Sequence, residues 1–282
     1  DKGAQIKSVT ITAKDKIRFP EEQEGNPDDS PYSIGYYDRI NEALWDILHH
    51  ENQMTRSVIE SYAKKHVVSP FEFSLDISLF CDVIIGDYNY LFDPTVYLRR
   101  FFEDNSEAYY FLIDEAHNLV NRSREMYSAS IHRQSFNSVF KSFSKNDKKI
   151  LKNLKKIDQE FAAIEETAQE SGWTFHHQKG QADTLLKLLF RFSELVKEWL
   201  AANEGNPQEE KILDLYFDVL RFLKMSDFYD ETYETTIEIM YHDLKIRQFC
   251  MSPAPFLADT LHKGKASLLF SASLTPLPYY QE

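Results

Sequence analysis

The residues of this sequence best suited to chemistry lie in the run Asp114–Glu115–Ala116–His117. They directly follow Tyr109–Ile113, a short apolar run that predicts a strand buried on both faces of a parallel sheet. In open α/β sheets, ligands bind at the carboxyl ends of the strands. There, Asp114 would hold Mg²⁺ through its water shell, and Glu115 would orient or deprotonate a water that attacks a phosphate. The alternative is a strand that ends in a solvated acidic turn.

The flanking sequence predicts the elements that position these residues. Two further short runs, at 6–12 and 81–88, predict strands, and the stretch from 13 to 32 predicts an irregular loop that contains three prolines. Helical spacing predicts helices over 36–49 and 55–65, and Pro70 predicts an extended or turn conformation at 69–73. Residues 124–224 are helical in pattern almost throughout, with breaks at Ser171–Gly172 and 204–207. Alternation over 233–251 predicts a β-hairpin, and 267–270 predicts a last buried strand.

Three motifs together resemble one family. The run D-E-A-H-N-L resembles the Walker B (DEAH) box of superfamily 2 helicases of the XPD/DinG type, G-D-Y-N-Y-L-F-D-P matches the segment that precedes this box in the family, and S-A-S-L-T-P resembles helicase motif III. The resemblance covers nearly the whole chain. It implies an α/β plus α fold: a partial parallel RecA-like sheet with a small irregular and helical insertion and a large helical arch insertion. It assigns 1–12, 76–124 and 233–282 to RecA-like domain 1, 13–75 to an iron–sulfur-type domain, and 125–232 to the arch domain.

By resemblance, the parent protein is an ATP-dependent helicase that moves 5′ to 3′ on single-stranded DNA with ATP and Mg²⁺. Asp114 would serve the Mg²⁺ ion, Glu115 the attacking water, and His117 with Ser271 and Ser273 the coupling to DNA. No phosphate-binding loop of the form G-x-x-x-x-G-K-[ST] is present; the nearest run, Gly264–Lys265–Ala266, has Asp259 at the upstream glycine position. We therefore expect a central fragment that is inactive by itself.

The family's [4Fe–4S] cluster requires four cysteine thiolates. The expected positions hold other residues here: Arg18, Gly25, Ser30 and Ser69. We therefore predict a cluster-free domain in which these four positions still lie close together. Packing would come from aromatic side chains, and the Arg18 guanidinium would need solvent or an acidic partner such as Asp28 or Asp29; the aromatic residues are Phe19, Tyr32, Tyr36, Phe71 and Phe73.

A lysine run crosses the predicted arch, with Asp147 as its only acid: Lys141, Lys145, Lys148, Lys149, Lys152, Lys155 and Lys156. A solvated face is the commoner meaning of such a run, and contact with single-stranded DNA is the alternative. The net charge of −13 argues against a general nucleic-acid coat but leaves room for a local basic path. The paired histidines lack metal-ligand spacing.

Cys81 and Cys250 lie next to apolar segments, so we expect both to be buried structural thiols rather than a disulfide. The sequence has no apolar run of membrane-spanning length and no signal-peptide form at its start, so we expect a cytoplasmic, nucleoid-associated protein without membrane contact. Repair or replication proteins are the further partners that the resemblance implies. Two alternatives stay open: a helical interaction module that hydrolyses nothing, and the helicase part of a helicase–exonuclease.

Overall fold

In the computed structural model, the described residues are 6–22, 30–96, 98, 101, 109–203 and 205–273. They fall into two compact units, residues 1–90 and 91–282. Two parallel sheets, one antiparallel sheet and many helices give the α/β plus α fold that the sequence predicts. None of the helices in the described part of the chain combines the length and the apolar character of a membrane-crossing segment.

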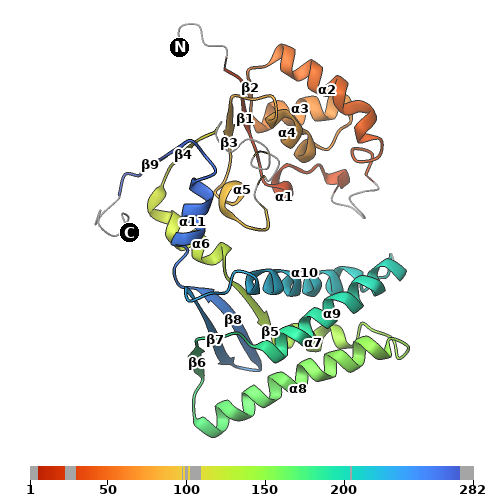
Figure 1. Ribbon diagram of the computed structural model, residues 1–282. Helices are drawn as coiled ribbons and strands as arrows, with labels where there is room; N and C mark the ends of the chain where they lie inside the picture. Colours follow the sequence, from red (N-terminus) through yellow and green to blue (C-terminus); the bar gives the residue numbers. More distant parts are fainter. Residues whose placement is uncertain are drawn as a thin grey trace. The chain divides into compact units, whose positions relative to one another are not determined.

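Unit 1 joins a small parallel sheet to a group of helices (Figure 1). The sheet has the order β2–β1–β3, with β1 at Ser8–Thr10, β2 at Gln53–Met54 and β3 at Val83–Ile85. The helices are α1 (Lys14–Ile17), the 3-10 turn η1 (Pro20–Glu22), α2 (Tyr36–His50), α3 (Arg56–His66), α4 (Pro70–Ser78) and α5 (Asn89–Phe92). The predicted helices at 36–49 and 55–65 are therefore confirmed within one residue.

The core of unit 1 contains the aromatic residues that the sequence analysis selected. Phe19, Tyr36 and Phe73 are buried in it, and Tyr32 and Phe71 pack against its edge. Two local predictions were wrong. The prolines at 20 and 70 begin helical turns, because a proline at the first position of a helix gives up only an N–H that has no partner there. Cys81 is half-exposed at the edge of this core, whereas Cys250 in unit 2 is buried as expected; both are free thiols.

Unit 2 contains a four-stranded antiparallel sheet covered by long helices (Figure 1). The strand order is β5–β8–β7–β6, with β5 at Ala129–His132, β6 at Phe175–Gln178, β7 at Tyr233–Met240 and β8 at Asp243–Cys250. The helices are α6 (Leu119–Met126), α7 (Arg133–Phe140), α8 (Lys148–Ser171), α9 (Asp183–Ala202), α10 (Glu209–Ser226) and α11 (Ala254–Leu261). Helices α8, α9 and α10 lie side by side.

The hairpin β7–β8 forms as predicted, but its partners are β5 and β6 from within the region predicted to be almost wholly helical. One face of the sheet, including Ile131, Ile237 and Ile246, is buried in the same core as the helices. The sheet's apolar face is thereby covered by α7 and α10, and both edges of the hairpin are paired. The predicted division of the chain into a RecA-like domain and an arch domain stays a prediction, although the hairpin belongs structurally with the helices.

Candidate active site

The second sheet of unit 2 brings the two polar motifs together. Strand β4 (Tyr110–Ile113) pairs in parallel with β9 (Ala266–Leu269), with Ile113 opposite Leu269. Beyond the strands, the Phe270 N–H donates to the Ile113 carbonyl at 3.0 Å, and the Ala116 N–H donates to the Phe270 carbonyl at 3.1 Å. The acidic motif and the serine motif therefore leave the same edge of the sheet, as parallel pairing requires.

The sequence predicts that strand β4 is buried on both faces, and this prediction is wrong. Tyr110 is 64% exposed and Leu112 is 71% exposed. The cause is the size of this sheet: among the described residues, β9 is the only strand that pairs with β4. Gly264, just before β9, has a packing role, because a Cβ there would lie 2.6 Å from the Phe111 ring. Packing against Phe111 therefore accounts for this glycine without any phosphate.

Backbone geometry at Glu115 is unusual. Its φ of 49° lies in the left-handed region, where a non-glycine residue is uncommon, and strain of this kind concentrates at functional sites. The Glu115 N–H donates to the Asp114 carboxylate at 2.7 Å, which closes the turn. A 3-10 turn, η4 (Ala116–Asn118), follows and leads into α6. The chain thus turns sharply at the carboxylate that we assign to the attacking water.

The Glu115, His117 and Ser271 side chains form a hydrogen-bonded cluster. The His117 Nδ1 atom lies 2.7 Å from the Ser271 hydroxyl and 3.0 Å from the Glu115 carboxylate. The Ser271 hydroxyl donates to the same carboxylate at 3.2 Å. A proton on Nδ1 satisfies all three contacts, since the hydroxyl then accepts from the imidazole and donates to the carboxylate. Residues 154 positions apart are thereby coupled to the candidate water-orienting group.

Ser273 joins this cluster through its backbone. Its N–H donates to the Ser271 hydroxyl at 3.2 Å, while its own side chain is exposed. Of the five predicted site residues, the structure thus brings Glu115, His117 and Ser271 into direct contact, Ser273 through its N–H, and Asp114 through the turn. The two neighbouring carboxylates suit Mg²⁺, which takes one or two carboxylates together with phosphates. Within the described ranges, no group of three or more His, Cys, Asp or Glu side chains forms a metal-ligand cluster.

Two of the four predicted cluster positions, Ser30 and Ser69, contact Tyr32, and so does the residue that follows a third, Arg18. Ser30 accepts a hydrogen bond at its hydroxyl from the Tyr32 N–H at 3.1 Å, and the Ser69 N–H donates to the Tyr32 carbonyl at 3.1 Å. Phe19, which follows Arg18, packs its ring 4.7 Å from that of Tyr32. Gly25, Asp28 and Asp29 lie outside the described residues. The donor set does not fit an iron–sulfur cluster, because serine hydroxyls and a guanidinium cannot replace four thiolates.

Sequence reasoning missed Arg39, which cross-links this segment. Its guanidinium donates to the carbonyls of Pro31 at 2.9 Å, Ile34 at 2.7 Å and Val67 at 2.8 Å. The first two follow Ser30 in the chain, and Val67, whose φ of 54° is left-handed, lies two residues before Ser69. No pattern in the sequence signals this role, because Arg39 occupies the polar side of an ordinary amphipathic helix.

The lysine run lies at the start of α8 and in the turn before it. All seven lysine side chains are exposed. The first turn of α8 contains no acidic residue, so its lysines oppose the helix dipole. Two acids further along the helix share one cation, because Arg133 contacts both Asp158 and Glu165 at 2.7 Å. The exposed end of α8 is therefore a concentrated positive patch on an acidic chain.

Comparisons with known proteins find similarity to helicases over part of the chain. A sequence model of the DEAD_2 family matches residues 31–136. The general transcription and DNA repair factor IIH helicase subunit XPD of Dictyostelium discoideum is 29% identical over 103 residues, which are 36% of this chain and 13% of that protein. A solved structure described as truncated XPD matches with a TM-score of 0.51 and 16% identity, over 98% of this chain and 76% of its own. A structure described as XPD helicase matches with a TM-score of 0.49 and 16% identity, over 96% and 46%.

The chain is similar to the DEAD_2 family over residues 31–136 and to an XPD helicase subunit over 103 residues, which supports the XPD/DinG-type resemblance that the sequence motifs predicted. The chain spans 13% of the length of its curated relative.

Proposed function

We propose that this chain is the part of an ATP-dependent DNA helicase that holds the water-orienting carboxylate and couples it to DNA. The observation that carries the proposal is the contact of His117 with both Glu115 and Ser271. Glu115 positions the attacking water, and Asp114 holds Mg²⁺ through water. The Ser271 hydroxyl then transmits movement of β9 to Glu115 and His117, since it bonds to both.

The parent enzyme moves 5′ to 3′ on single-stranded DNA in the cytoplasm, and its relation to a repair-factor helicase favours a role in DNA repair with protein partners. Residues 13–75 work without an iron–sulfur cluster. The chain by itself hydrolyses no ATP at a useful rate, because its sequence has no loop to hold the β- and γ-phosphates.

The test is unwinding by the parent protein of partial duplexes with either a 5′ or a 3′ single-stranded tail, in ATP and Mg²⁺. The expected result is ATP-dependent unwinding of the 5′-tailed duplex. Unwinding only of the 3′-tailed duplex would refute the polarity, and absence of DNA-stimulated ATP turnover in the parent would refute the function. The chain by itself is the matched control, and turnover near one per second from it would contradict the fragment assignment.

The positive patch on α8 offers a contact for the DNA backbone. Changing Lys148, Lys149 and Lys152 to Glu should lower the affinity for single-stranded DNA by at least tenfold and flatten its salt dependence. The slope of log K against log salt is about −0.7 for each phosphate contacted on a single strand, and each lost contact removes that amount. A filter-binding titration between low and moderate salt measures both quantities. An unchanged slope would show that single-stranded DNA binds to another surface.

A further inference from the structure

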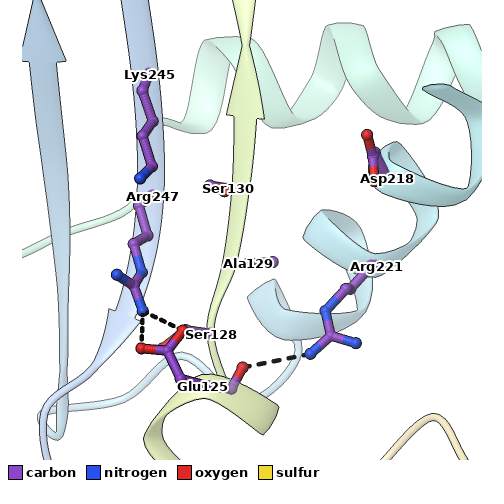
Figure 2. Close-up of a pocket in the computed structure, with 8 residues that line it drawn as sticks. All are labelled: Glu125, Ser128, Ala129, Ser130, Asp218, Arg221, Lys245 and Arg247. Carbon is purple, nitrogen blue, oxygen red and sulfur yellow. Dashed lines mark hydrogen bonds and ion pairs between the residues drawn. The ribbon is translucent and has the colours of Figure 1, made fainter. Parts of the chain in front are cut away.

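A polar cavity of about 300 Å³ opens in unit 2 beside the strands β5 and β8 (Figure 2). Its walls come from four elements that are far apart in the sequence: the end of α6, the start of β5, the middle of α10 and the middle of β8. The lining residues are Glu125, Ser128, Ala129, Ser130, Asp218, Arg221, Lys245 and Arg247. The cavity shares no residue with the Glu115–His117–Ser271 cluster, and the motif analysis did not detect it.

Two of its three cations are held in place by other groups of the chain: Arg247 by the Glu125 carboxylate, and Arg221 by two backbone carbonyls and by the buried Asp93 carboxylate, which lies 3.8 Å from its Nη1 atom. The Arg247 Nη2 atom lies 2.8 and 2.9 Å from the two carboxylate oxygens of Glu125. The Arg221 Nη2 atom donates to the backbone carbonyls of Glu125 at 3.3 Å and Met126 at 3.1 Å. The Arg247 guanidinium also lies 4.6 Å above the Phe249 ring, which fixes its plane. Both guanidinium groups are thus oriented before any ligand arrives, and each keeps N–H donors beyond these bonds.

The third cation, Lys245, makes no ion pair with any described residue. It lies two positions before Arg247 on the same face of β8, and Figure 2 shows its side chain directed along the strand toward Arg247. His132 and Glu238 are its cross-strand neighbours, but neither comes within ion-pair distance. Lys245 and Arg247 therefore place two positive charges on one face of β8, and of the two only Arg247 has a carboxylate partner among the described residues.

The neutral and acidic groups fit an anion as well. The Ser130 hydroxyl makes no hydrogen bond to a described residue, whereas Ser128 is already used, since it donates to the Arg124 carbonyl and accepts from the Cys250 N–H. Burial and the neighbouring Asp214 raise the pKa of the Asp218 carboxyl, against the influence of His132 and Arg221. Asp218 therefore takes up a proton more readily than an ordinary aspartate does as the pH falls.

We propose that this cavity is a binding site for a phosphate group, with Lys245 and Arg247 as its charged donors and Ser130 as its neutral donor. Arginine suits this role, because its planar fork matches the oxygens of a phosphate. The volume lies at the lower end of the range of about 300–1,000 Å³ for small-ligand sites, which suits a phosphate group with its waters. The phosphate belongs either to the DNA backbone, which rests on the proposed function, or to a small phosphate compound, which does not.

The experiment is calorimetric titration of the full chain with inorganic phosphate at low ionic strength, comparing wild type with Lys245→Gln, Lys245→Arg and Lys187→Gln. Lys187 is an exposed lysine of α9 outside the cavity and supplies the matched loss of one charge. Lys245→Gln should weaken phosphate binding about tenfold, because it removes one charge-assisted hydrogen bond. Lys245→Arg should restore most of the affinity, and Lys187→Gln should leave it unchanged. Circular dichroism confirms that each variant is folded.

A parallel titration with single-stranded DNA separates the two sources of phosphate. Loss of affinity for both probes in Lys245→Gln assigns the site to the DNA backbone, and loss for inorganic phosphate alone assigns it to a small phosphate compound. Equal phosphate binding by Lys245→Gln and Lys187→Gln, or no saturable binding by wild type, overturns the site. If the α8 lysine variant loses DNA affinity while Lys245→Gln binds both probes normally, the proposed function stands and this inference fails.

Discussion

At the edge of the β4–β9 sheet, three polar side chains contact one another directly, whereas around Ser30 and Ser69 the cross-links run through backbone groups and one arginine. Glu115, His117 and Ser271 each use a specific side-chain atom. In the second region, Arg39 binds three backbone carbonyls, and the predicted ligand positions hold residues that cannot bind iron. The difference fits the two proposed tasks. Orienting a water requires one functional group at one place, while closing a loop can be done by any groups that join the same segments.

The most disruptive change is predicted at the sheet edge. In the parent protein, Glu115→Gln should lower DNA-stimulated ATP turnover by about 10²- to 10⁴-fold while nucleotide binding persists, because the amide keeps the shape but not the basicity of the carboxylate. Steady-state turnover and a fluorescent-nucleotide titration measure the two effects. Glu166→Gln, an exposed acid of α8, is the control and should change neither. Turnover within a factor of about two of wild type would rule out the role of Glu115.

The cross-link in residues 13–75 should respond in stability rather than in chemistry. Arg39→Met should lower the free energy of unfolding by about 0.5–1.5 kcal/mol, since it removes three hydrogen bonds to carbonyls that water can then solvate. Chemical denaturation measures the loss. Arg56→Met is the matched control: Arg56 forms an exposed pair with Glu60 at 2.7 Å, and such a pair contributes about 0.5 kcal/mol or less.

Treatment with an iron chelator tests whether residues 13–75 depend on bound iron. Treatment of the wild-type protein should leave the denaturation midpoint unchanged if Arg39 and the aromatic core replace a cluster. A chelator-induced fall in the midpoint, or stoichiometric iron in the purified protein, would show that other groups bind the metal.

A smaller effect is expected for the hydroxyl between the two motifs. Ser271→Ala in the parent should reduce DNA stimulation of ATP turnover about three- to tenfold, because the variant loses one net hydrogen bond to each partner. Ser273→Ala is a close control, since Ser273 contributes only its backbone N–H, which alanine retains. Turnover measured with and without single-stranded DNA separates coupling from chemistry. Equal losses in the two variants would show that position 271 has no special role.

The smallest expected effect is on the stability of unit 1, and it appears only at low pH. Asp46 accepts hydrogen bonds from Lys65 and from His66 at 2.7 Å, and these contacts lower the pKa of its carboxyl from 3.8 to about 2. A lowered pKa adds stability above pH 3.8, and this stability is lost as the pH falls toward 2. Acid unfolding followed by circular dichroism should therefore show a steeper loss between pH 4 and 2 in wild type than in Asp46→Asn. If the acid-unfolding curves of wild type and Asp46→Asn run in parallel, Asp46 does not contribute to the loss of stability in acid.

The sequence by itself determined the local features: the helices at 36–49 and 55–65, the hairpin at 233–251, and the carboxylates that follow the strand at 110–113. Each depends on residue spacing within about 20 positions, which hydrophobic periodicity reports directly. It also placed the serine motif after a strand, and resemblance to a family supplied the idea that this motif meets His117.

Only the tertiary structure decided which distant groups meet. The His117–Ser271 contact joins residues 154 positions apart, and the β5–β8 pairing brings Ser130 opposite Arg247. Strands β5 and β6 were missed because each has four residues, too few for alternation to stand out within a helical pattern. The sequence did not predict the role of Arg39, because its partners are backbone carbonyls. It did not predict the cavity beside β5 and β8 either, because the lining side chains come from several elements. Such sites leave no periodic signal, because they exist only once packing has brought their parts together.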